Sequence, residues 1–135
     1  MIFTHERSVV GRLGLLLLSI LLVTSSPARA VENGDGNQIP VENTVTMVDL
    51  GANNCLPCRM MTPIIAELKK TYQGKAAIIF IDVYRDSTSA KKFHAMIIPT
   101  QIFFDRKGNE VSRHQGFMEK EEIIKELNSL LAQKG

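Results

Sequence analysis

The pattern of apolar and polar residues divides this chain into alternating predicted strands and helices. A β-branched and apolar segment at 44–50 predicts a buried strand. A continuous apolar run at 76–83 predicts a second strand, covered on both faces of its sheet. Two short β segments at 100–104 and 110–114 flank a turn that contains Gly108, so they predict a β-hairpin.

Three further segments predict helices. Apolar residues recur at helical spacing over 55–72, and Pro63 is expected to kink that helix. Residues 87–95 predict a short helix, and residues 119–133 predict an amphipathic one. The order of these elements predicts an α/β fold with a mixed sheet and helices on both faces. The positions expected to be buried in the two longer helices are Met60, Ile64, Ile65, Leu68, Ile123, Ile124, Leu127, Leu130 and Leu131.

Residues 1–30 have the composition of a secretory signal peptide. Arg7 and Arg12 precede an apolar run at 13–23, and small residues up to Ala30 supply a cleavage site. That run is about half the length of a helix that crosses a bilayer. We therefore expect export, to the periplasm, with cleavage after Ala30. An uncleaved signal that anchors the protein in the membrane is the alternative.

The rest of the chain predicts one domain. Residues 31–43 form a loose polar lead-in with room for one short strand, and residues 44–135 form the domain. The whole chain has 16 basic and 14 acidic residues, of which three basic and one acidic lie in the signal segment, so 13 of each remain. This balance gives no reason to expect binding to nucleic acid. We expect a monomer.

The chain has two cysteines, in a Cys-Leu-Pro-Cys motif at 55–58, where the first predicted strand leads into the first helix. A disulfide across so short a ring removes little entropy from the unfolded chain, so a purely structural bridge explains it poorly. A closed zinc site would need more ligands, for which only His94 and His114 are candidates. We therefore expect a redox-active disulfide between Cys55 and Cys58, with no metal and no other cofactor.

Four features of the sequence occur together in a particular order and spacing. They are Val48-Asp49, the Cys-Leu-Pro-Cys motif, Pro63 and Ile98-Pro99-Thr100. With these features the chain resembles the thioredoxin-fold family from about residue 44 to its C-terminus. The resemblance implies a three-layer sandwich around a central mixed sheet.

The resemblance also implies where a substrate binds. It implies a cis peptide at Ile98-Pro99 that lies beside the cysteines and presents backbone groups to a bound substrate strand. We expect Leu56 and Pro57, between the cysteines, to belong to the same substrate-binding surface. One departure from the family is Asn54, which stands where the family usually has Trp.

The positions of the cysteines suggest different roles for them. A helix N-terminus lowers the pKa of a thiol placed there, so Cys55 is expected to be the exposed nucleophile and Cys58 the resolving thiol. Asp49 is the candidate base for Cys58, because a carboxylate in an apolar strand would have a raised pKa. The alternative is that Asp49 ends its strand with its carboxylate in solvent.

These observations favour an exported thiol-disulfide oxidoreductase that reduces protein disulfides. Neither Leu56 nor Pro57 can stabilise a thiolate by charge, so we expect the dithiol to act as a reductant, as Cys-Gly-Pro-Cys does in the family. A membrane thiol-transfer partner would supply the electrons. The alternatives are a disulfide oxidant or isomerase, a copper metallochaperone that uses Cys55 and Cys58, and a non-catalytic binding module.

Overall fold

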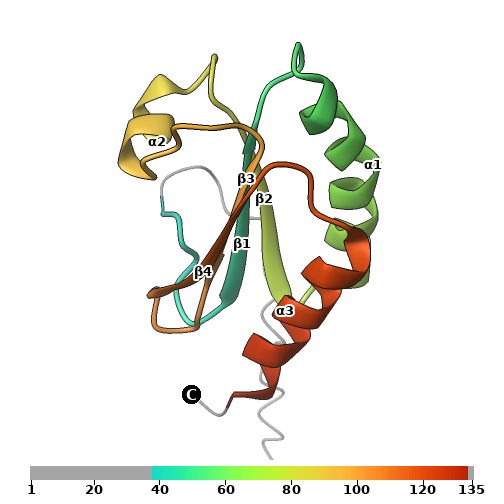
Figure 1. Cartoon of the computed structure of the whole chain (residues 1–135). Coiled ribbons are helices and arrows are strands. Elements are labelled where there is room, and N and C mark those ends of the chain that lie inside the picture. The colour runs from blue at the N-terminus through green and yellow to red at the C-terminus, as the bar shows by residue number, and fades with distance from the viewer. Residues whose placement is uncertain (1–37, 134–135) are drawn as a thin grey trace, which may run out of the picture.

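The computed structural model describes residues 38–133. Its central layer is a four-stranded mixed sheet with the strand order β2-β1-β3-β4 (Figure 1). Strand β1 (Val45–Gly51) runs parallel to β2 (Ala76–Asp82) and antiparallel to β3 (Thr100–Phe104). Strand β4 (Glu110–Gln115) is antiparallel to β3. The bounds of these strands and their order along the chain agree closely with the prediction.

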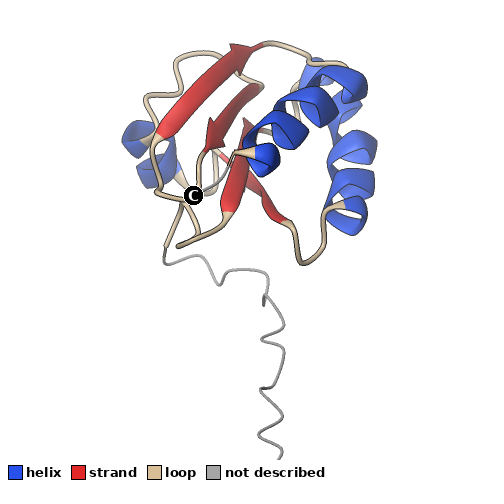
Figure 2. Cartoon of the chain, turned by 90° about the horizontal axis from the view of Figure 1, so that it is seen from below, coloured by secondary structure: helices blue, strands red, loops and turns tan. Residues whose placement is uncertain are grey.

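Helices cover both faces of this sheet (Figures 1 and 2). Helix α1 (Leu56–Thr71) and helix α3 (Lys120–Ala132) pack on one face. Helix α2 (Ser87–Lys92) lies on the other. This arrangement confirms the predicted α/β sandwich with a mixed central sheet.

Two apolar clusters hold the layers together, and β1 contributes to both because successive side chains of a strand point to opposite faces. Val45 and Met47 face α1 and α3, whereas Val48 and Leu50 face the α2 side. Burial of apolar surface on both faces makes β1 the centre of the core. The first cluster also contains Met61, Ile65, Leu68, Tyr72, Ala76, Ile78, Phe103, Met118, Ile123, Leu127 and Leu130. The second also contains Ile81, Phe93, Ile102 and Phe104.

The phase of α1 differs by one residue from the prediction at its first turn. Met60 is 51% exposed, whereas Met61 is fully buried. The buried stripe runs from Cys58 through Met61 to Ile65, which are spaced three and four residues apart and so share one face of the helix. The prediction that Met60 is buried is therefore wrong. The helix continues through Pro63.

Strand β2 is less covered than predicted. Ile78 and Ile81 are buried on opposite faces, as expected for a strand between two layers. Phe80, however, is 38% exposed. Within the described residues β2 is an edge strand of the sheet, so its apolar run lacks a neighbour on one side.

The connections agree with the prediction in kind. The hairpin turn between β3 and β4 places Gly108 at a φ of 81°, where glycine is favoured, and its N–H donates to the Asp105 carbonyl. Helix α2 ends earlier than predicted, since Phe93 is its C-cap and His94 has a φ of 50°. Residues 38–44 contain no strand or helix.

The predicted signal peptide at 1–30 lies outside the described residues, as does the first half of the lead-in. Within 38–133, no helix has both the length and the apolar character needed to cross a membrane.

Candidate active site

The two cysteines lie at the junction between β1 and α1. Strand β1 ends at Gly51, a turn follows at Asn53 and Asn54, and Cys55 is the N-cap residue of α1. A disulfide joins Cys55 to Cys58, with their Cα atoms 5.2 Å apart. The sequence thus brings both sulfur atoms to the start of a helix, at the carboxyl end of the central strand.

The two sulfur atoms have different surroundings. The Cys58 N–H donates to the Cys55 Sγ over 3.3 Å, so an unpaired amide of the first helical turn is directed at that sulfur. Cys55 is half-buried, whereas Cys58 is only 3% exposed. Pro57 fits the first turn, because the N–H that it lacks would have no partner inside the helix there. Only Cys55 is open to a large partner.

The loop at 94–99, which we call the docking loop, lies beside Cys55. Its Ile98-Pro99 peptide is cis, as expected from the resemblance. The Cys55 Sγ lies 3.9 Å from the Ile98 carbonyl oxygen. The Pro99 carbonyl accepts a hydrogen bond of 2.8 Å from the Gly116 N–H. Ile98 and Cys55, which are 43 residues apart in the chain, therefore meet at one site.

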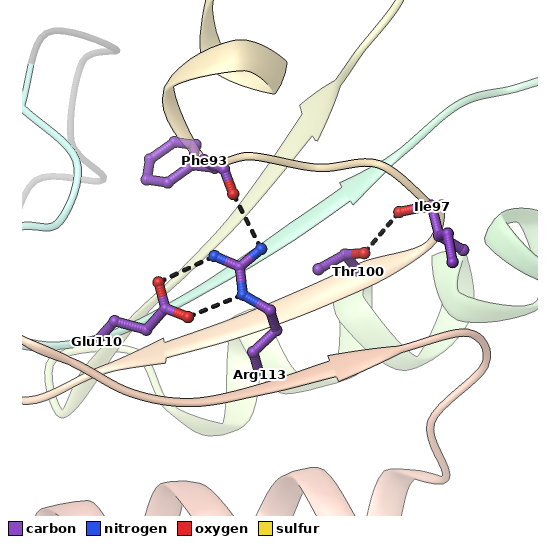
Figure 3. Close-up of polar contacts among 5 residues, drawn as sticks. All are labelled: Phe93, Ile97, Thr100, Glu110 and Arg113. Carbon is purple, nitrogen blue, oxygen red and sulfur yellow. Dashed lines mark hydrogen bonds and ion pairs between the residues drawn. The ribbon is translucent and has the colours of Figure 1, made fainter.

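Side chains from the sheet hold both ends of the docking loop (Figure 3). The Arg113 Nη1 donates to the Phe93 carbonyl over 2.9 Å, at the end of α2. Its Nε and Nη2 donate to the Glu110 carboxylate over 2.8 and 2.9 Å, and this pairing lowers the pKa of Glu110. At the other end, the Thr100 hydroxyl donates to the Ile97 carbonyl over 2.6 Å.

Asp49 is buried inside the sheet layer. Its side chain is 1% exposed, so the alternative in which its carboxylate lies in solvent is wrong. The Gln101 Nε2 donates to Asp49 Oδ1 over 2.9 Å. Burial raises the pKa of the Asp49 carboxyl from 3.8 to about 6, and the hydrogen bond from Gln101 opposes that rise. Asp49 can therefore change its protonation state close to neutral pH.

Asp49 lies on the same face of β1 as Gly51, the residue that contacts Cys58. A Cβ atom on residue 51 would lie 3.5 Å from the Cys58 Sγ and 3.1 Å from the Phe80 ring. Alternate residues of a strand are about 7 Å apart, so the Asp49 carboxyl lies one step further from the helix N-terminus than this contact. Asp49 therefore lies on the face of the sheet against which Cys58 packs, with Phe80 in register on the neighbouring strand.

Three residues of this site were missed in the sequence. Gln101 was readable as a polar residue inside an otherwise apolar strand, a position that needs a hydrogen-bond partner. Gly51 gave no signal beyond that of a glycine at the end of a predicted strand. Arg113 carried no local signal, because its partner carbonyl at Phe93 is twenty residues away.

The segments next to the disulfide carry exposed apolar side chains. Leu56 is 69% exposed and Met60 is 51% exposed at the start of α1. Met96 is 88% and Ile97 53% exposed in the docking loop. Tyr84 follows Val83, whose N–H bonds the Gly51 carbonyl, so it lies at the same edge of the sheet. Leu56 and Pro57, both predicted as substrate-binding residues, are exposed here.

Among the residues that the structure describes, no three His, Cys, Asp or Glu side chains gather where they could hold a metal ion.

A three-layer α/β fold that places a dithiol pair at a helix N-terminus, beside a cis-proline loop, defines a thiol-disulfide oxidoreductase. The sequence model of the thioredoxin family matches residues 32–129. The chain therefore belongs to the thioredoxin family, and it is an enzyme of the protein-disulfide reductase type.

Individual relatives agree with this assignment. The chain is 40% identical to thioredoxin of Staphylococcus aureus over 91 residues, which cover 67% of this chain and 86% of that protein. The crystal structure of a Nicotiana alata thioredoxin superposes with a TM-score of 0.59 and 32% identity, covering 65% of this chain and 74% of that one. Fasciola hepatica thioredoxin gives a TM-score of 0.59 with 25% identity over 66% of this chain and 83% of its own.

Proposed function

We propose that this member of the thioredoxin family is exported to the periplasm and reduces protein disulfides in that compartment. Cys55 is the attacking thiol and Cys58 the resolving thiol. The observation that carries the assignment of roles is the contrast between the two sulfur atoms. Cys55 is half-exposed and receives an amide N–H of the helix, whereas Cys58 is buried. Donors at a helix N-terminus favour a thiolate, and the thiolate is the nucleophile of disulfide exchange.

The reaction moves two electrons from the dithiol to the substrate. The Cys55 thiolate attacks one sulfur of a substrate disulfide, and the other substrate sulfur leaves as a thiolate that takes a proton from solvent. Cys58 then gives its proton to Asp49 and attacks the Cys55 sulfur. This step forms the Cys55–Cys58 disulfide and releases the second substrate sulfur as a thiolate, which takes up a proton from solvent while Asp49 returns its own proton to solvent. The substrate is thereby reduced and the dithiol is oxidised.

The exposed apolar side chains near the disulfide, among them Leu56, Met60 and Met96, fit a segment of unfolded or loosely folded polypeptide as substrate. Met60 and Met96 carry flexible, polarizable side chains that adapt to varied partners. The Ile98 carbonyl, close to Cys55, is placed to accept a hydrogen bond from the backbone of such a segment.

Export and the electron donor are proposed from the sequence. The charged start, apolar run and small residues up to Ala30 have the pattern of a signal peptide. A reductant in an oxidising compartment must be reduced again after each turnover, so a membrane protein that transfers thiol electrons is the class of donor required.

The decisive experiment measures the reduction potential of residues 31–135 and its rate of reduction of a protein disulfide. We expect a potential nearer to about −270 mV than to about −120 mV, because no charged residue separates the cysteines. A potential at the oxidising end would favour an oxidant or isomerase, and tight Cu(I) binding without reductase activity would favour a metallochaperone. Cell fractionation with an antibody against the domain tests export: recovery of the full-length chain in the cytoplasm alone would contradict it.

A further inference from the structure

A row of side chains crosses the sheet beneath the cysteines. Phe80 on β2, Asp49 on β1, Gln101 on β3 and His114 on β4 are partners in register, one beside the next. Neighbouring strands are about 4.8 Å apart, so only direct neighbours in this row are in contact. The partner of Asp49 in hydrogen bonding is Gln101.

Gln101 is an unusual residue for its place. It is fully buried between Thr100 and Ile102 in a strand whose other side chains are mainly apolar. A buried amide that loses its hydrogen-bond partner destabilises the fold, whereas Leu or Phe at the same position would need no such partner. Its Nε2 donates to Asp49 Oδ1, and within residues 38–133 neither Asp49 Oδ2 nor Gln101 Oε1 has a hydrogen-bond partner.

We propose that Gln101 is a positioning residue of the thiol chemistry: it occupies Asp49 Oδ1 and leaves Oδ2 free to take the proton of Cys58. This inference rests on the proposed function, since it assigns the device that makes Asp49 a working base. A carboxylate has two oxygens, and an amide N–H on one of them fixes the carboxyl plane as well as its charge. Gln101 does not touch the substrate and acts only through Asp49.

The same hydrogen bond sets the pH range in which Asp49 works. An N–H donated to a carboxylate stabilises the ionised form, so it counteracts the rise in pKa that burial causes. Without the Gln101 amide, Asp49 would stay protonated to a higher pH and could not accept the Cys58 proton. A hydrogen bond to a charged group shifts the pKa of that group by about one unit or more.

Few other groups can set the charge of Asp49. Helix α1 presents Cys58, β2 presents Phe80, and α3 packs on this face through Ile123 and Leu127. On β4 the residue in register with Gln101 is His114, two strand spacings or about 10 Å from Asp49. Its Nε2 lies 3.1 Å from the Phe117 carbonyl, in contact with a different part of the chain.

The test isolates the resolution step. Cys55 of the reduced protein is converted to a mixed disulfide with thionitrobenzoate, and release of the coloured thiol by Cys58 is followed from pH 5 to 9. For Gln101→Leu we expect the pH profile to shift upward by about one unit, with release about fivefold slower at pH 6 and nearly normal above pH 8. Gln115→Leu, on the exposed end of β4, is the matched control and should follow the parent. Gln101→Met replaces the leucine variant if that one folds poorly.

A double variant separates positioning from general damage. In an Asp49→Asn background, Gln101→Leu should leave the pH profile unchanged, because the base is already gone. An equal change in both backgrounds, or no shift in either, would overturn the proposal. In the unmodified oxidised protein, the side-chain amide resonance of Gln101 must titrate together with the Asp49 carboxyl, and its failure to do so would also overturn it. That measurement needs no turnover, so it separates this inference from failure of the reductase assignment.

Discussion

Gly51 packs so closely against Cys58 that a side chain at residue 51 would fit only if its neighbours moved by a few tenths of an ångström. A Cβ atom there would lie 3.3 Å from the Cys58 Cβ and 3.1 Å from the Phe80 ring. The strand that carries Asp49 therefore meets the resolving cysteine through bare backbone.

Gly51→Ala should loosen this contact. The added methyl group must displace Cys58 or Phe80, and overpacking of this kind costs about 1–3 kcal/mol. We expect a lower free energy of unfolding in urea for the oxidised protein. Asn54→Ala, in the exposed turn, is the control and should stay within about 0.5 kcal/mol of the parent. Equal stability of the Gly51 variant and the parent would show that the helix start moves freely against β1.

Cys58→Ser should trap substrate proteins as mixed disulfides through Cys55. The attacking thiol remains, but no second thiol releases the partner. Cys55→Ser should trap none, because Cys58 is 3% exposed. The measurement is a non-reducing gel of complexes captured from cells, with reduction as the control. If both variants trap partners to the same extent, the assigned roles are wrong.

Asp49→Asn should change how stability depends on pH. The pKa of Asp49 in the folded protein is about 6, against 3.8 in the unfolded chain. Below about pH 4 the carboxyl is mostly protonated in both states, so it does not lower the free energy of unfolding there. As pH rises from 4 to 6, the unfolded state releases the proton first and stability falls, by about 2–3 kcal/mol above pH 6. The asparagine variant should lack this fall and be at least as stable as the parent at pH 7. Urea unfolding at pH 4, 5, 6 and 7 checks it.

The same variant should be a slower reductase near neutral pH. Asparagine fills nearly the same space but cannot accept a proton from Cys58. The defect should shrink as pH rises, because more Cys58 ionises unaided. Turnover that equals that of the parent at every pH would mean that the Cys58 proton goes elsewhere.

Arg113→Met should disturb the docking loop without unfolding the protein. The variant loses the hydrogen bonds from the guanidinium to Phe93 and to Glu110, which together stabilise the fold by about 1–2 kcal/mol. We expect KM for a protein disulfide to rise several-fold with little change in kcat, since Cys55 and Cys58 are untouched. Arg85→Met, at an exposed arginine, is the control. A change in kcat alone would contradict this role for Arg113.

The elements of this fold were predictable because each carries its own local pattern. Helix α3 shows it most clearly, since Ile123, Leu127 and Leu130 recur on one face and all are buried. The exposure of Met60 was not predictable, because neighbouring methionines compete for the same face and only packing against the sheet decides between them. The Cys-Leu-Pro-Cys motif located the site from sequence. The Asp49–Gln101 hydrogen bond did not follow from it, since its residues meet only through strand pairing across 52 positions.

Strand β1 has hydrogen-bonded neighbours on both sides, β2 and β3. Amide protons in such a strand exchange with deuterium only when a large part of the sheet opens. We therefore expect the amides around Asp49 to be among the slowest to exchange, whereas the docking loop lies outside the sheet and is held by a few side-chain and backbone hydrogen bonds near its two ends. Under the proposed mechanism, we expect the loop to adjust to partners of different shape while Asp49 keeps its place in the paired sheet. Differences among substrates would then be accommodated on one side of the disulfide, and the geometry of proton transfer on the other side would be the same for all of them.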